Sequence, residues 1–214
     1  MRARFLAAVL GCALATPSLA QERFPLIPAE QRTPEQQALA AAIQSGPRAN
    51  VSGRDNCIGG PFNVWLRSPG VGNRLQELGS ELRFRTSLPQ ALNEFAILIT
   101  AREWSSQYEW YAHHRLALAA GLPASVAADL AEGRRPANMS DDQRIIYDFC
   151  TELHRTRFVS DATYEAVKQR FGERGVVDLI AVSGYYVAVA MTLNTARVGL
   201  PAGVAPPLPT LPPR

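Results

Sequence analysis

The sequence predicts an all-α protein of about eight helices, and three observations favour this fold class. Apolar residues recur at helical spacing through most of the chain, as at Val71, Leu75, Leu78 and Leu82. Proline, glycine and serine residues separate these segments, and no segment has the alternating pattern of a convincing strand. The chain has 214 residues, of which 47% are hydrophobic, so it can build one substantial core.

Helical periodicity and helix-starting residues define the expected helices, which cover residues 35–46, 71–85, 89–103, 104–121, 126–133, 141–157, 161–172 and 173–195. Ser140 and Gln143 form a capping box before the sixth of these helices. The segment 48–63 is rich in glycine, asparagine and aspartate, so we expect a loop there. The last helix is apolar over most of its circumference, so we expect it to be buried against the core or a second subunit.

Residues 1–20 have the pattern of a secretory signal peptide. Arg2 and Arg4 precede an apolar run, and the segment ends in the small-x-small sequence Ser18-Leu19-Ala20. The apolar run has about eleven residues, fewer than the roughly 20 that span a bilayer. We therefore expect a periplasmic or secreted protein with cleavage after Ala20, and Cys12 leaves a lipoprotein as an alternative.

The rest of the chain divides into three parts. We expect residues 21–54 to form an extended arm and the first helix, and residues 55–200 to form the main domain. Residues 201–214 are a proline-rich tail, which we expect to be extended and to become ordered only against a neighbouring molecule.

Charge and cysteine content exclude several functions. The 22 basic residues less Arg2 and Arg4, against 19 acidic residues, leave a net charge of about +1 on the mature chain, with no basic stripe for nucleic acid. Cys57 and Cys150 remain after cleavage, and their wide separation excludes a CxxC redox motif. The sequence is compatible with a disulfide between the two cysteines and with two separate buried thiols.

Ionisable residues concentrate in the segment 93–122, which is otherwise apolar. Glu109 and His113 lie one helical turn apart, so they face the same neighbour. Glu94 belongs to the preceding apolar helix, where an unpaired carboxylate is costly, so we expect it to pair with the Glu109 and His113 face. These three residues are therefore the first candidates for a functional site.

This segment resembles the carboxymuconolactone decarboxylase and AhpD-like family, whose redox branch has the pattern E-x11-C-x2-C-x3-H. The glutamate of the pattern matches Glu94, the two cysteines fall on Ser106 and Glu109, and the histidine matches His113. The resemblance covers roughly residues 55–200. It implies an AhpD-like bundle of helical hairpins assembled into trimers or hexamers, with pockets near subunit boundaries and no cofactor or metal.

The first functional hypothesis is an exported, cofactor-free lyase or isomerase that acts on a small lactone or oxo acid. Its catalytic residues would be Glu94, Glu109 and His113: His113 supplies the proton, and a glutamate orients or recharges it. The residues expected to contact the substrate are Ser106, Tyr108, Trp110, Gly60, Pro61 and Phe62.

Three alternatives remain beside this hypothesis. A non-catalytic periplasmic binding or assembly protein on the same fold is compatible with the sequence. A metal site made by two glutamates and one histidine is chemically plausible, although the family pattern does not call for one. A thiol peroxidase is disfavoured because Ser106 and Glu109 stand where the redox thiols would be.

Overall fold

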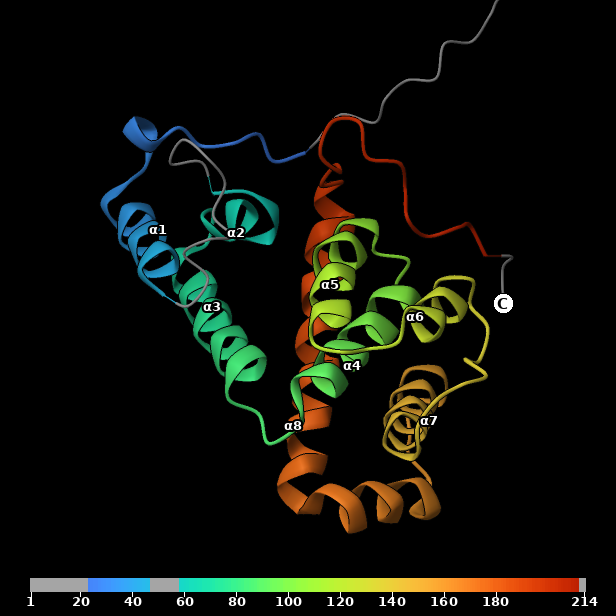
Figure 1. The fold of residues 1–214 in the computed structure, drawn as a ribbon. Helices are drawn as coiled ribbons and strands as arrows, with labels where there is room; N and C mark the ends of the chain where they lie inside the picture. Colours follow the sequence, from blue (N-terminus) through green and yellow to red (C-terminus); the bar gives the residue numbers. More distant parts are fainter. Residues whose placement is uncertain (1–22, 47–57, 212–214) are drawn as a thin grey trace, which may run out of the picture.

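The computed structural model describes residues 23–46 and 58–211 (Figure 1). Within these ranges the structure is helical, without strands, which confirms the all-α prediction. The α-helices are α1 (Pro34–Ser45), α2 (Gly60–Trp65), α3 (Pro69–Phe84), α4 (Gln90–Glu103), α5 (Gln107–Ala119), α6 (Ala124–Ala131), α7 (Asp141–Thr156) and α8 (Asp161–Ala196). The expected signal segment 1–20 and Cys57 lie outside the described residues, so the structure does not bear on cleavage or on a disulfide at Cys57.

Helix α4 lies at the centre of the bundle. Every residue from Leu92 to Arg102 is buried, because α5, α6, α7 and α8 pack against this helix from different sides (Figure 1). The apolar run from Phe95 to Ile99 supplies the core of these contacts. Helices α2 and α3 pack against the remaining side of α8, and α1 packs on α3. Glu94 therefore stands in the most enclosed helix of the fold.

Helix α8 joins the two segments that were expected as separate helices, 161–172 and 173–195. Gly172 has φ 71° and ψ 175° within it, and the helix changes direction at this residue (Figure 1). The positive φ favours glycine, because a side chain at this position would meet its own backbone. The long arm after Gly172 runs behind α4 and α5 (Figure 1). It carries Tyr186 against His113 of α5 and Tyr185 toward Trp65 of α2.

Only one face of α8 is buried. Leu179, Val182 and Leu193 belong to the core, whereas Ile180, which the sequence pattern placed with them, is 50% exposed. By length and composition α8 is apolar enough to cross a membrane, and half of its most apolar window is buried inside the protein.

Two helix starts differ from the sequence prediction. Helix α5 begins at Gln107 instead of near Trp104, because Trp104 and Ser105 close the end of α4 with backbone bonds to Thr100 and Arg102, and Ser105 has φ 48°. Helix α2 begins at Gly60, so residues 60–63 are helical and not part of a loop. Pro61 fits there because proline suits the first turn of a helix. The capping box of Ser140 and Gln143 is present as predicted.

The proline-rich tail packs against its own chain as far as residue 211. The side-chain amide of Gln107 donates to the backbone oxygen of Leu208 at 2.8 Å and accepts from its backbone nitrogen at 2.9 Å. Arg102 donates to the backbone oxygen of Pro209 at 3.0 Å. Leu208 is buried among the core residues. A neighbouring molecule is therefore not required to order this part of the tail.

Candidate functional site

The α4 and α5 hairpin brings Glu94 and His113 into direct contact. Oε2 of Glu94 lies 2.7 Å from Nδ1 of His113, and both side chains are buried. Gln90 donates to Oε1 of Glu94 at 3.1 Å, and Nε of Arg83 lies 3.9 Å from the same oxygen. These donors stabilise a negative charge on Glu94, which is otherwise enclosed in the core. The expected partnership of Glu94 with the face of α5 thus involves His113 and not Glu109.

The contact with Glu94 determines how the His113 ring can act. A carboxylate only accepts hydrogen bonds, so Nδ1 of His113 carries the hydrogen. Nε2 then keeps its lone pair and is the ring atom available to a ligand. The ring also meets Tyr186 edge-on, with ring centres 5.0 Å apart and planes at 84°, which fixes its orientation. We call this arrangement the Glu94–His113 pair, and it has the geometry of a general base with an orienting carboxylate.

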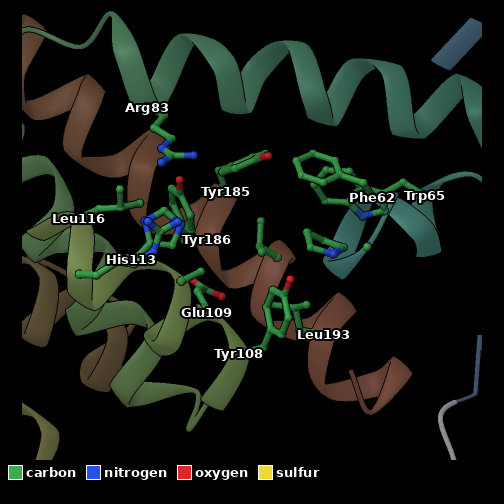
Figure 2. A pocket seen from close by; sticks show the side chains of 15 residues that line it. Phe62, Trp65, Arg83, Tyr108, Glu109, His113, Leu116, Tyr185, Tyr186 and Leu193 are labelled. Carbon is green, nitrogen blue, oxygen red and sulfur yellow. The ribbon is translucent and has the colours of Figure 1, made fainter. Parts of the chain in front are cut away.

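The free face of His113 borders a cavity of about 90 Å³ between α5, α8, α2 and α3. A cavity of this size holds several water molecules or a small organic molecule. Several aromatic side chains line it, and Figure 2 shows Phe62 and Trp65 across the cavity from His113, with Tyr185 and Tyr186 between them. The cavity therefore suits a flat, largely apolar molecule with a few polar atoms.

Glu109 is the second ionisable group on the cavity wall. Its side chain is on the helical turn before His113 and is only 1% exposed. Neither of its carboxyl oxygens has a hydrogen-bond partner among the described residues. Burial raises the pKa of Glu109 well above its usual value. Burial therefore favours the neutral carboxylic acid form of Glu109.

Two arginines give the cavity a positive character. Arg83 reaches it from α3 with a side chain that is almost fully buried, and Arg115 lines it from α5 (Figure 2 shows Arg83). Sequence analysis did not select either residue. Arg83 lies in a helix whose pattern indicates only scaffold, and its reach into the cavity depends on how α3 packs against α8. The adjacent tyrosines 185 and 186 were visible in the sequence, but only as a sign that the last helix is buried.

The residues expected to contact a substrate divide into two groups. Pro61, Phe62 and Tyr108 line the cavity. Gly60 lies next to the Tyr108 ring and does not line this cavity. Together, Gly60 and Tyr108 line a second cavity of about 210 Å³.

Ser106 and Trp110 are buried away from the cavity. Ser106 occupies the N-cap position of α5, because this helix begins later than expected. Trp110 faces the core and stacks on His114, with ring centres 5.8 Å apart.

Among the described residues, no three His, Cys, Asp or Glu side chains are placed to hold a metal ion together. Comparison with known proteins adds no identification: no family model, no curated protein and no solved structure matches the chain. The site geometry and the match of Glu94 and His113 to the two ends of the family pattern therefore carry the functional proposal.

Proposed function

We propose that this protein is a cofactor-free lyase or isomerase of the carboxymuconolactone decarboxylase type, which transfers a proton on a small lactone or oxo acid. The observation that carries the proposal is the 2.7 Å contact of the Glu94–His113 pair beside an aromatic-walled cavity. An imidazole with one nitrogen held by a carboxylate and the other available to a ligand is suited to general acid and base catalysis.

The proposed chemistry needs one proton and no redox step. In an isomerase, Nε2 of His113 removes a proton from the carbon next to a carbonyl, the electron pair moves to the carbonyl oxygen, and the imidazolium returns the proton to another carbon. In a lyase, the breaking carbon–carbon bond releases CO2 and supplies the electron pair, and protonated His113 donates its proton to carbon. In both cases the charge of Glu94 stabilises the imidazolium.

The positive charge at the cavity is suited to binding a small anionic substrate. Burial favours the neutral form of Glu109, and Arg83 is directed at Glu94. Arg115 therefore adds a positive charge at the cavity. A positive, partly enclosed site concentrates small anions. Lactone acids and oxo acids carry such a charge.

Thiol chemistry has little support in the described part of the chain. Cys150 is a free, fully buried thiol, 3.6 Å from the hydroxyl of Ser183, and it does not line the cavity. Burial raises the pKa of Cys150 to about 12, so the reactive thiolate is scarce at neutral pH. We therefore do not propose a peroxidase.

The proposed location is outside the cytoplasm, on the basis of the signal-like pattern of residues 2–20. Protein isolated from its source should then begin at Gln21 or within about two residues of it. Native protein that retains Met1 would contradict export.

The test of the function is exchange of carbon-bound hydrogen with deuterated water, measured by NMR for a panel of lactones and oxo acids. Wild type should exchange or decarboxylate at least one compound, and His113→Ala should lower the rate on the order of 10²–10⁴-fold. His114→Gln is the matched control, because the neighbouring histidine does not line the cavity. Full activity in His113→Ala would refute the role of His113. Binding without any exchange by wild type would favour a non-catalytic small-molecule-binding protein.

A further inference from the structure

The carboxyl group of Glu109 lies on the cavity wall but is not part of the Glu94–His113 pair. Glu109 lies in the first turn of α5, and His113 follows on the next turn of the same helix. Both side chains line the cavity, and Figure 2 shows them on the same side of it. Both oxygens of Glu109 lack hydrogen-bond partners among the described residues, although the side chain is buried.

The neighbouring elements explain why Glu109 has no protein partner. Arg83 of α3 and Gln90 of α4 are directed at Glu94, and Nδ1 of His113 is held by the same carboxylate. The indole nitrogen of Trp65, from α2, donates to Thr192 at 3.3 Å. A buried polar group without a partner lowers stability, so its presence on a cavity wall indicates that a ligand completes its hydrogen bonds.

The protonation of Glu109 determines the kind of ligand with which it can form a hydrogen bond. Burial without a cationic partner keeps the carboxyl group neutral, so it can donate a hydrogen bond as well as accept one. A carboxylic acid donates most strongly to an oxygen that carries negative charge. The aromatic walls at Phe62 and Tyr186 favour a flat ring, and Arg83 favours an anion.

We propose that Glu109 is a neutral hydrogen-bond donor for a ring-borne oxyanion, so that the cavity binds planar enolates and phenolates in preference to their neutral forms. This assignment deepens the proposed function: His113 moves the proton at carbon, and Glu109 stabilises the oxygen that becomes charged. The proton of Glu109 is shared in the hydrogen bond and is not consumed, so the group needs no recharging between turnovers. Glu109 is then a catalytic residue that acts on the substrate oxygen and not on His113.

Phenols test this assignment without any turnover. The absorbance of 4-nitrophenol distinguishes its phenol form from its phenolate form, so binding of each form is measured directly by titration at several pH values. Wild type should bind the phenolate about tenfold or more tightly than the phenol. Glu109→Leu, which cannot donate, should lose this preference. Glu109→Gln should retain most of it, because its amide is a neutral donor of similar shape.

Matched controls separate this inference from the proposed function. Glu165→Leu removes an exposed carboxylate of α8 and should leave phenolate binding unchanged. Equal affinity of wild type for phenol and phenolate, or an unchanged preference in folded Glu109→Leu, would refute the assignment of Glu109 even if hydrogen exchange is observed. If Glu109→Gln loses the preference as completely as Glu109→Leu, the neutral-donor role is also refuted. Phenolate binding through Glu109 without exchange of any lactone or oxo acid would refute the proposed reaction alone.

Discussion

Glu94 and His113 lie 19 positions apart in the sequence, yet Oε2 of the glutamate is 2.7 Å from Nδ1 of the histidine. The short turn between α4 and α5 makes this contact possible, because it folds α5 back along the most buried helix of the protein. Gln90 and Arg83 then supply donors to the other carboxyl oxygen. The glutamate therefore has a charged form that is stabilised inside the core, and the histidine has a fixed orientation.

Replacement of Glu94 by glutamine should reduce catalysis more than it changes binding. The amide oxygen can still accept from Nδ1 of His113, but it has no charge to stabilise the imidazolium. We expect Glu94→Gln to lower kcat on the order of 10²–10⁴-fold with little change in KM, as measured by the exchange assay. Glu81→Gln, which removes an exposed carboxylate paired with Arg85, should leave both constants unchanged. A raised KM with normal kcat in Glu94→Gln would show that Glu94 only shapes the cavity.

Glu109 should lower the stability of the protein as pH rises. The folded protein keeps the Glu109 proton, whereas the unfolded chain releases it above about pH 4.5, its ordinary pKa. The free energy of unfolding then falls by up to about 1.4 kcal/mol per pH unit until pH reaches the raised pKa of the folded state. Glu109→Gln has no proton to lose. We expect its Tm to equal that of wild type near pH 4 and to exceed it at pH 8, as followed by circular dichroism; a lower Tm at pH 8 would contradict a neutral Glu109.

Gly60 should tolerate substitution less well than its neighbour Gly59. Gly60 has φ 60°, and a Cβ atom there would lie 3.0 Å from the hydroxyl of Tyr108. Gly59 has φ −101°, and a Cβ atom there would meet nothing within 4 Å. We expect Gly60→Ala to lower the free energy of unfolding by about 1–2 kcal/mol and to weaken ligand binding through Tyr108. Gly59→Ala should be close to wild type in urea denaturation, and equal losses in both variants would argue against this strain.

The sequence pattern selects Glu94, Glu109 and His113 as site candidates for identifiable reasons. Glu109 and His113 share a helix face by their spacing, and Glu94 was found because a carboxylate in an apolar helix needs a partner. The same helical stripe also selected Ser106 and Trp110, which face the core. The cavity lies to one side of that stripe. Glu109 and His113 are therefore buried residues that also line the cavity, whereas Ser106 and Trp110 do not line it.

Other parts of the site depend on tertiary packing, which periodicity does not describe. Arg83 reaches the cavity because α3 packs against α8, and no local pattern distinguishes it from the other arginines of the chain. The position of Leu208 in the core depends on a hydrogen bond from Gln107, which is about one hundred residues away in the sequence. Helix boundaries differ by a few residues where backbone hydrogen bonds close a turn between two helices, as at Ser105 and Ser106.

The tail should contribute measurably to stability. Leu208 is 3% exposed, and its backbone exchanges two hydrogen bonds with the side chain of Gln107, next to the cavity residue Tyr108. We expect Leu208→Ala to lower the free energy of unfolding by about 2 kcal/mol, as for other buried leucines. Leu26→Ala, at an exposed leucine, should change it by less than about 0.5 kcal/mol. Equal effects in thermal denaturation would mean that the tail does not pack stably in solution.

Helix α8 carries an exposed apolar stripe along one face. Val177 is 63% exposed, Ile180 is 50% exposed, and Met191 is exposed further along the same helix. Gly184 lies between them with open space around its Cα. The spacing of three, seven and fourteen residues from Val177 places all four on one face, as in the contact seam of packed helices. A contiguous exposed apolar patch often marks a surface that contacts another molecule.

We propose that this stripe forms the interface of a closed homo-oligomer, with a trimer favoured over a dimer. Ile180→Glu places a charge in the stripe, so it should lower the mass measured by light scattering toward that of the mature monomer, about 21 kDa. Phe158→Glu is the matched control, because Phe158 is also apolar and exposed but lies in the turn before α8. A monomeric wild type at micromolar concentration would contradict the oligomer. Recovery of the wild type only in detergent would instead show that the stripe contacts lipid, because α8 is also long and apolar enough to cross a membrane.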